Sequence, residues 1–505
     1  MTMGIAMTLQ DPPHRSTTES RSTHGDAALD AGTKTDSEYL GQLGYKQELK
    51  RALGLVSSFG IQFSAIAVAS ALFTTIGVGF GYFGPASFWS FVIGGAFQVF
   101  FVGIAIAELV SAYPLSGGVY QIVSRLTKKP WLGWQTGWWI VIAHIVSIPA
   151  IAVAIAPAVA GWFGVEFADP GEALPWVLGI IVAGTIVNIV HVRIATAVNN
   201  VGVICELVAT VIVVVALIAV PHPTQPASIL FDTAGTTDGG FILPLLLAFV
   251  LPAFIISAFD ATGNAGEETK NASRTAPLGQ LLANGAGWLF GSIFLFLLMI
   301  SIPDVRAVMA DSFPGKLILE SAIGPVLSNI FEVLAIIALF ACNCIIQLTG
   351  VRVLWSQARD GQLPGSTWLK KVNRWGVPVN ATLVCFAIAI IFAVWSSALS
   401  VLTAMVALSW ALAYTVAVFV GFWALMRKRV PARPFTTGRW WPLVFGVAAL
   451  WSVVLCTAIV LTDPFAVGGG MVLVIAVGIA IYLLIPKSRR GKIQGITTPT
   501  STVNK

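Results

Sequence analysis

Three side chains that could titrate or pair with a charged ligand lie inside long apolar stretches of this sequence. They are Asp260, Glu206 and His144. An ionisable group in the interior of a membrane is costly and is usually functional. Asp260 could pair with a substrate ammonium or carry a proton, and His144 could titrate near neutral pH or hydrogen-bond a substrate. The structural alternatives are an aspartate that accepts backbone N–H groups, a glutamate that hydrogen-bonds between helices, and a satisfied core histidine.

The apolar stretches that carry these side chains are long enough to cross a lipid bilayer. The 505 residues are 56% hydrophobic and 10% charged, whereas soluble domains are about 25% charged. The stretch from Ala52 to Ala107 contains no Asp, Glu, Lys or Arg, and a membrane helix needs only ~20 apolar residues. This composition excludes a soluble enzyme, a disordered regulator and a disulfide-rich secreted domain. It predicts an all-α polytopic membrane protein in contact with the lipid bilayer.

Twelve apolar runs predict twelve transmembrane helices. Their approximate bounds are 53–80, 86–112, 131–160, 174–192, 195–220, 241–262, 277–303, 325–350, 378–396, 399–426, 440–462 and 465–486. Lys and Arg indicate the orientation, because short cytoplasmic loops carry the excess of both. With the amino-terminal side inside, the outer loops hold only Arg306 and Lys316 of the 29 Lys and Arg residues. A multi-pass protein of the cell membrane with both termini in the cytoplasm is therefore predicted.

The cysteines and the basic residues indicate no metal, cofactor or nucleic-acid site. All five cysteines lie in apolar segments, where they are expected to be packing thiols. Cys342 and Cys344 lack the further ligands that a zinc site needs. The basic residues lie in loops between apolar runs, so no nucleic acid is expected as a partner. A short interfacial helix is expected over residues 117–126.

The first and sixth runs are predicted to form interrupted helices. The first is crowded with Ser, Thr and Gly, and the sixth contains Pro244 and Pro252 before the polar stretch 257–264. Proline removes a backbone donor, and non-helical backbone at membrane depth needs protein or a water-filled cavity beside it. At an interruption, the free N–H groups of the helix end that follows attract a carboxylate, and the free carbonyls of the helix end that precedes attract an ammonium. A zwitterionic amino acid fits such a pair of interruptions.

The separation of these two runs by five spans predicts an inverted repeat. An odd number of spans makes the second copy enter the membrane from the opposite side. The predicted organisation is a disordered cytoplasmic tail (1–45), a first five-helix repeat (46–220), a second, inverted repeat (221–430), two further helices (431–486) and a cytoplasmic carboxy-terminal tail (487–505).

Three segments of the sequence resemble the signatures of a known family. Residues 107–120 read AELVSAYPLSGGVY, residues 259–261 read FDA and are followed by EETKNA, and residues 358–364 read ARDGQLP. With the opening LGYKQELKR, they resemble permeases of the amino acid–polyamine–organocation superfamily, in the amino acid/choline transporter branch that includes GABA permeases. The resemblance covers residues 43–486. It implies a LeuT-like fold of five plus five inverted helices with two carboxy-terminal helices, and secondary transport of amino acids or related amines.

The resemblance also implies a substrate site around the two interruptions. Members of the family often have Gly-Ser-Gly at the place that corresponds to residues 69–71, and the alanine Cβ atoms here narrow the approach of a ligand to the backbone. For Asn343, hydrogen bonding between helices is the alternative. The expected substrate-binding residues are Ser64, Ala69, Ser70, Ala71, Leu72, His144, Ser257, Ala258, Phe259, Asp260 and Asn343.

Proton coupling and an inner gate complete the expected machinery. Several proton-coupled members of the family resemble this chain here but have a lysine in place of Glu206. That lysine contacts the first interruption, and its protonation controls access to the site. Glu206 could act in the same way with the opposite charge, since protonation would neutralise it. Asp260 is the second candidate for proton coupling. Charged residues near the inner ends of helices are either solvated loop charges or ion pairs of an inner gate. The gate candidates are Glu108, Glu267, Glu268, Lys270, Arg352 and Arg359.

These features predict a secondary active transporter for an amino acid or a small amine such as GABA, which works by alternating access and is coupled to protons. The alternatives are an exchanger of two related solutes and a transport-dead nutrient sensor. An enzyme is not expected, because no HExxH, GxSxG or paired carboxylate lies at membrane depth.

Overall fold

The computed structural model describes residues 40–41, 51, 53–167, 169–190, 192–219, 225–396, 398–490 and 493. Within these residues the regular structure is helical, with an isolated β-bridge between Leu53 and Thr269. Nine helical stretches of the described chain are long and apolar enough to cross a membrane. This confirms the prediction of an all-helical, polytopic membrane protein. The predicted tails 1–45 and 487–505 lie outside the described residues, except for residues 40–41, 487–490 and 493.

The first apolar run forms two helices that are separated at Ala67. Helix α3 (Leu55–Ile66) and helix α4 (Val68–Phe83) are joined by Ala67, whose φ of 34° and ψ of 57° are left-handed. For a residue other than glycine this conformation persists only where the surrounding structure holds it. The interruption therefore lies two residues before the predicted position. Residues 69–72 already belong to α4.

The sixth apolar run is interrupted where the sequence predicts it. Helix α11 (Ile242–Ala248) and helix α12 (Val250–Ile255) are followed by non-helical backbone, in which Ala258 has a φ of 53°. The chain resumes in the short helix α13 (Ala261–Asn264) and the 3₁₀ turn η6 (Gly266–Glu268). Proline at two positions of this run removes backbone donors, which weakens the helix.

The second apolar run is one continuous helix whose hydrogen-bonding pattern changes along its length. It begins with the 3₁₀ turn η2 (Gly84–Ala86) and helix α5 (Ser87–Phe97), passes through the π-helical segment η3 (Gln98–Gly103) and ends in helix α6 (Ile104–Ala112). The short helix expected over residues 117–126 is present as α7 (Gly118–Thr127).

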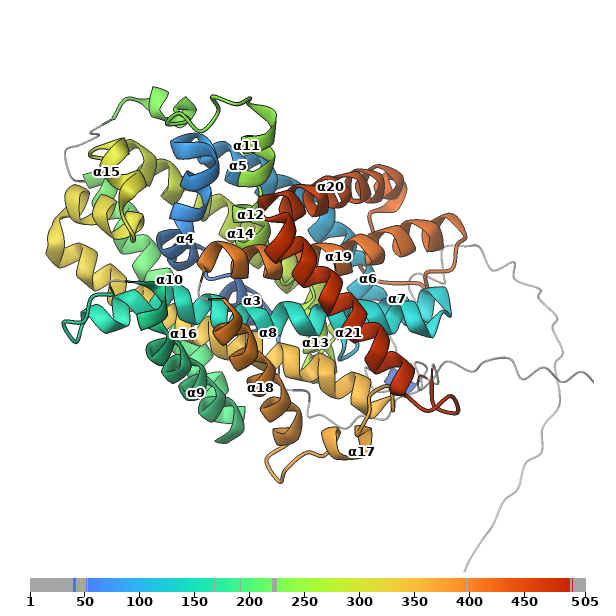
Figure 1. The fold of residues 1–505 in the computed structure, drawn as a ribbon. Coiled ribbons are helices and arrows are strands. Elements are labelled where there is room, and N and C mark those ends of the chain that lie inside the picture. Colours follow the sequence, from blue (N-terminus) through green and yellow to red (C-terminus); the bar gives the residue numbers. More distant parts are fainter. Residues whose placement is uncertain are drawn as a thin grey trace, which may run out of the picture.

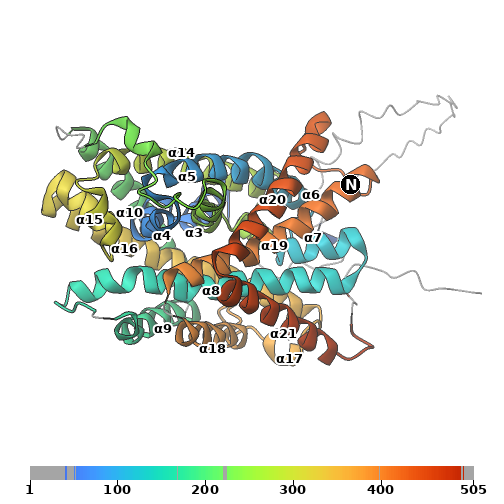
Figure 2. The ribbon, with the colours of Figure 1, turned by 45° about the horizontal axis from the view of Figure 1, so that its top comes forward.

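Helix α8 (Pro130–Gly161) runs through the middle of the molecule in both views (Figures 1 and 2). The remaining α-helices are α9 (Leu174–Val190), α10 (Val192–Ala219), α14 (Ala272–Ile300), α15 (Val305–Ala310), α16 (Pro314–Arg359), α17 (Ser366–Leu369), α18 (Val379–Trp395), α19 (Leu399–Met426), α20 (Trp441–Thr462) and α21 (Gly470–Leu484). Short 3₁₀ or π segments are η4 (Pro170–Ala173), η5 (Ala227–Phe231), η7 (Gly438–Trp440) and η8 (Pro464–Gly469). Helices α16 and α19 pack against α8, and α9 and α18 lie side by side next to it (Figure 1).

The two ends of the bundle carry different elements. Helices α7 and α17 lie at one end and α15 lies at the other in both views (Figures 1 and 2). The loops at the α7 and α17 end are rich in Lys and Arg, for example Lys128 and Lys129 after α7 and Lys370 and Lys371 after α17. We call this end the basic end and the other the α15 end.

At the α15 end, α16 begins with a short helical segment that packs against α4. Gly324 (φ 78°, ψ 164°) breaks the helix just before Pro325, and we call the preceding residues 314–323 the cover segment. Lys316 Nζ in the cover segment lies 3.0 Å from Oε2 of Glu332, whose side chain is buried. The ion pair holds the cover segment against the main part of α16.

Aromatic contacts on either side of the cover segment, and a close backbone contact within it, hold it on α4. The ring of Phe73 on α4 meets Phe313 and Phe331 edge-on, at centroid separations of 4.9 and 5.0 Å. Gly315 lies against the backbone of Phe73, so closely that a Cβ at this position would overlap the Phe73 carbonyl oxygen. The small size of Gly315 is therefore required for the cover segment to sit on α4.

We expect Gly315→Ala to lower the melting temperature of the purified protein, with a loss of about 1–3 kcal/mol of unfolding free energy from overpacking. The obstructing atom belongs to the backbone and cannot move aside as a side chain can. The matched control is Gly285→Ala in α14, where nothing lies within 4 Å of the added Cβ and alanine favours the helix. Equal melting temperatures for the two variants would contradict this account of the cover segment.

Candidate functional site

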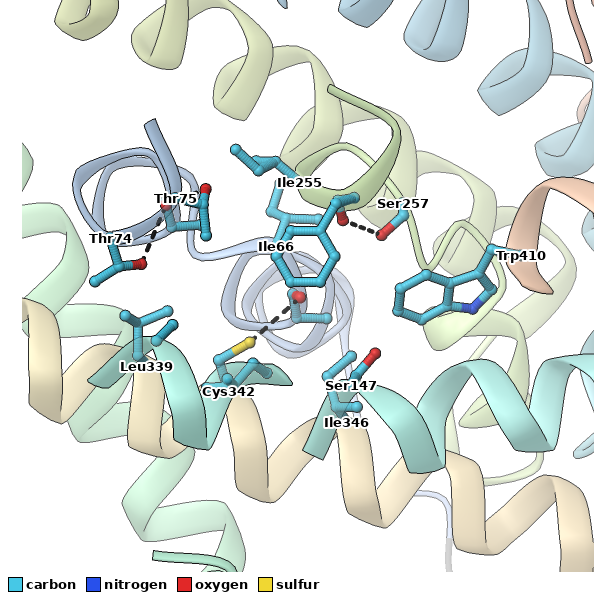
Figure 3. Close-up of a pocket in the computed structure, with 15 residues that line it drawn as sticks. Ile66, Thr74, Thr75, Ser147, Ile255, Ser257, Leu339, Cys342, Ile346 and Trp410 are labelled. Atoms are coloured by element: carbon cyan, nitrogen blue, oxygen red, sulfur yellow. Dashed lines mark hydrogen bonds between the residues drawn. The ribbon is translucent and has the colours of Figure 1, made fainter. Parts of the chain in front are cut away.

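A small cavity lies between the two interruptions, where α3, α4 and α12 face α8, α16 and α19 (Figure 3). Its lining residues are Ala65, Ile66, Ala71, Thr74, Thr75, Ser147, Ile151, Ala154, Phe254, Ile255, Ser257, Leu339, Cys342, Ile346 and Trp410. None of these side chains carries a formal charge. The cavity has a volume of about 30 Å³, far below the roughly 300–1,000 Å³ of typical ligand pockets. It must widen before it can hold a solute.

The hydroxyl groups in the cavity wall all donate to main-chain carbonyls of their own segment. The pairs are Thr74 Oγ1 to Ser70 O (3.1 Å), Thr75 Oγ1 to Ala71 O (2.7 Å), Ser147 Oγ to Ala143 O (2.8 Å) and Ser257 Oγ to Phe254 O (2.7 Å). The Cys342 thiol on α16 instead donates to another helix, at the carbonyl of Ala65 on α3 (3.4 Å; Figure 3). A hydroxyl has one proton and two lone pairs, so these oxygens are left as hydrogen-bond acceptors.

The carboxylate of Glu206 on α10 binds the amino end of α4. Its Oε1 accepts the N–H of Ala69 at 2.8 Å and the N–H of Ser70 at 3.3 Å, and the Ser70 hydroxyl donates to Oε2. The first N–H groups of a helix have no partner within it and attract anions. Glu206, which is buried, thus fills the anion site that the interruption at Ala67 creates.

Asp260 lies at the second interruption and is completely buried. Its Oδ1 accepts the Tyr414 hydroxyl at 2.7 Å and its Oδ2 accepts Asn264 Nδ2 at 3.1 Å. No described basic side chain forms an ion pair with it. Gly117 and Gly118 bring the start of α7 next to this carboxylate with φ values of 104° and 42°. A Cβ on Gly118 would lie 2.9 Å from Asp260 Oδ2, which explains the paired glycines of the sequence motif.

His144 on α8 is buried beside the cavity wall. Its Nδ1 lies 2.7 Å from Ile140 O, which makes Nδ1 the protonated nitrogen. Its ring meets the Trp410 ring edge-on at a centroid separation of 5.5 Å. Nε2 has no hydrogen-bond partner among the described residues. His144 therefore supports Trp410, which lines the cavity, and keeps one free acceptor.

Of the predicted substrate-binding residues, Ala71 and Ser257 line the cavity. Asn343 instead donates from Nδ2 to Ile148 O at 2.9 Å and so links α16 to α8, which is the alternative stated for it. The remaining ones are buried near the two interruptions or the cavity wall rather than in the lining: Ser64, Ala69, Ser70, Leu72, His144, Ala258, Phe259 and Asp260.

Two ion pairs join η6 to α16 at the basic end. The guanidinium of Arg359 binds Glu267 through two contacts, Nη2 to Oε1 at 3.0 Å and Nη1 to Oε2 at 3.1 Å, and Glu267 also accepts the Ser116 N–H at 3.1 Å. Arg352 lies 2.7 Å from Glu268. The Glu267 side chain is fully buried and that of Arg359 is 7% exposed. The structure thus brings together four of the predicted gate residues.

The other two gate candidates are placed differently. Glu108 is buried and binds the guanidinium of Arg433 as well as the N–H and hydroxyl of Thr437, in the chain between α19 and α20. Glu108 lies on α6, so these contacts bind α6 to the chain between α19 and α20 and are separate from the ion pairs of η6. Lys270 donates its backbone N–H to Leu53 O at 2.9 Å, and its exposed side chain takes part in no ion pair between described residues.

Several residues at the site were not identified from the sequence. Trp410 in the cavity wall and Tyr414 on Asp260 lie in the apolar run of α19, where no motif marks them. Arg433 lies in a basic loop like many other residues. Thr74 and Thr75 could have been identified as cavity residues from the sequence, because they are polar residues within an apolar membrane-spanning run.

Comparison with known proteins finds similar sequences over most of this chain. A family model described as "Amino acid permease" matches residues 53–482. The "Amino-acid permease BAT1 homolog" of Oryza sativa subsp. japonica is 25% identical over 468 residues, which cover 86% of this chain and 88% of the relative. The "Amino-acid permease BAT1" of Arabidopsis thaliana is 23% identical, with 82% and 86% covered. The "GABA-specific permease" of Saccharomyces cerevisiae is 26% identical, with 70% and 65% covered.

Proposed function

This chain belongs to the amino acid permease family, and on that premise we propose that it is a secondary active transporter. It moves an amino acid or a small amine such as GABA across the cell membrane by alternating access, in symport with protons. Amino acid transport across a membrane, and not an enzymatic reaction, is the activity of this family. The observation that carries the finer proposal is the cavity between two interrupted helices, with packed elements on either side of it.

The proposed topology has twelve spans in a LeuT-like arrangement. Helices α3 to α10 form the first repeat within residues 46–220, and α11 to α19 form the inverted second repeat within 221–430. Helices α20 and α21 follow within 431–486. The basic end faces the cytoplasm, because Lys and Arg accumulate on that side of a membrane. Both termini are then cytoplasmic, and the cover segment closes the cavity from outside.

The ion pairs at the basic end act as the inner gate. Glu267 with Arg359 and Glu268 with Arg352 join the exit of the second interruption to the inner end of α16. Opening toward the cytoplasm separates these elements, and the pairs reform when the cavity closes again. Glu108 and Lys270 take no part in this gate.

The proposed coupling site is Glu206, with Asp260 as the second acid. Glu206 links α10 to the tip of α4 through its carboxylate oxygens. The titratable side chains close to it are the thiols of Cys205 on the same helix and Cys342 on α16. Protonation removes the charge that holds the α4 amides, so the link between the two helices weakens. A proton on Glu206 therefore changes the relative stability of the closed and open states.

The test is uptake into proteoliposomes that contain the purified chain and an imposed proton gradient. We expect saturable uptake from a panel of labelled neutral amino acids and GABA, and its loss when a protonophore is added. Empty liposomes are the control. Absence of flux for every solute in the panel would favour the sensor and overturn the proposal.

An exchanger remains the alternative carrier. It differs from a symporter in one readout, since solute added outside accelerates the efflux of labelled solute while a protonophore has no effect. The same proteoliposomes, preloaded with the labelled solute, separate the two mechanisms.

A further inference from the structure

The donors and acceptors around the cavity favour one end of an amino acid over the other. We propose that the site recognises its ligand by the ammonium group, so that primary amines without a carboxylate bind at least as well as the amino acids from which they derive. This inference rests on the proposed transport function and specifies the substrate class. It is carried by three observations on the described residues.

The first observation is that Glu206 already binds two of the N–H groups at the start of α4. A substrate carboxylate would be drawn to the N–H groups at the start of this helix, but those of Ala69 and Ser70 donate to Glu206. The next N–H, of Ala71, donates to Ala67 O at 2.8 Å. A carboxylate in the cavity would have to displace Glu206 from these amides.

The second observation is the shortage of free side-chain donors in the cavity wall. Its four hydroxyls and its thiol already donate to carbonyls. The remaining side-chain donor is the indole N–H of Trp410. Figure 3 shows the six-membered ring of Trp410 turned toward the cavity, with its nitrogen on the far side. An ammonium needs acceptors and a carboxylate needs donors, so the wall suits the ammonium.

The third observation is the sign of the charge around the cavity. Glu206 and Asp260 are both buried, and no described basic side chain forms an ion pair with either. Buried carboxylates without a cation beside them attract a cationic ligand group. The lining residues contribute no charge that would offset this attraction. The apolar members of the lining, such as Ile66 and Leu339, then contact the hydrocarbon part of the ligand.

The experiment compares matched ligands on the purified full-length protein. One set is leucine, 3-methylbutylamine, which lacks the carboxylate, and 4-methylpentanoate, which lacks the ammonium. A second set is GABA, propylamine and butyrate. Binding is read as the shift in melting temperature against ligand concentration. In parallel, each compound competes with uptake in the proteoliposomes described above.

We expect each amine to bind with a dissociation constant equal to or lower than that of its amino acid, and each carboxylate to bind at least about 100-fold more weakly than the amine. The proposal is overturned if either amino acid binds more tightly than its amine. It is also overturned if a carboxylate binds as well as the amine, or if neither amine binds in the millimolar range. Absence of flux would overturn the transport function alone, because the melting shifts still report binding.

Two variants test the origin of the preference. Glu206→Ala frees the α4 amides, and we expect it to shift the amine-to-amino-acid affinity ratio at least tenfold toward the amino acid. Ser147→Ala removes an acceptor from the wall, and we expect about fivefold weaker amine binding. Its matched control is Ser292→Ala, whose hydroxyl donates to the Trp288 carbonyl one turn back in the same way but does not line the cavity. An unchanged ratio in Glu206→Ala, or equal loss in the two serine variants, would contradict the inference.

Discussion

Glu206→Gln is expected to abolish proton-driven accumulation while leaving the protein folded and able to exchange solute. With a gradient of about two pH units, symport with one proton sustains an inside-to-outside ratio of up to about 100, because each pH unit is worth ~1.36 kcal/mol. Without coupling the ratio falls to about 1. Glutamine keeps the size of Glu206 and one carbonyl oxygen to accept the Ala69 and Ser70 N–H groups. It cannot gain or lose the proton.

The measurement is the steady-state ratio of labelled solute in proteoliposomes, together with exchange in the absence of a gradient. The matched control is Glu166→Gln, an exposed glutamate in the chain that follows α8, which is expected to accumulate solute like the unmodified protein. Full accumulation by Glu206→Gln would show that the coupling proton is carried elsewhere, and Asp260→Asn would then be the next variant to measure.

Arg359→Ala is expected to open the cavity toward the cytoplasm. The substitution leaves the buried Glu267 carboxylate without its two guanidinium contacts. Removing one partner of a buried ion pair costs about 3–5 kcal/mol. If that cost falls on the closed state alone, the inward-open population rises by a factor of about 100 or more.

Cys342 provides a native reporter for this opening, since its thiol lines the cavity and is buried. We expect an impermeant thiol reagent applied from the cytoplasmic side to modify Cys342 about 100-fold faster in Arg359→Ala, as measured by peptide mass analysis. The control is Arg306→Ala, which removes an exposed arginine at the α15 end. Equal modification rates in the two variants would mean that Glu267 and Arg359 do not gate the cavity.

The second interruption could be predicted because its cause is local. Pro252 and the Ser, Gly and Asp residues after it weaken a helix wherever they stand, and the structure places non-helical backbone directly after α12. The first interruption was predicted two residues too far along the chain, because Ala67, where it lies, is not a residue that weakens a helix. Its left-handed backbone is held from outside, by packing and by Glu206 on the neighbouring α10.

The amino-acid sequence by itself determined the membrane character, the apolar runs and the group of charges at the inner ends of the predicted helices. These properties follow from the cost of placing charges in lipid, which acts on each residue separately. Only the tertiary structure decided which charges meet. It pairs Glu267 with Arg359, two residues of the same predicted set, but it joins Glu108 to Arg433 and Asp260 to Tyr414. Such contacts depend on how helices distant in the chain pack together, and no local pattern encodes that packing.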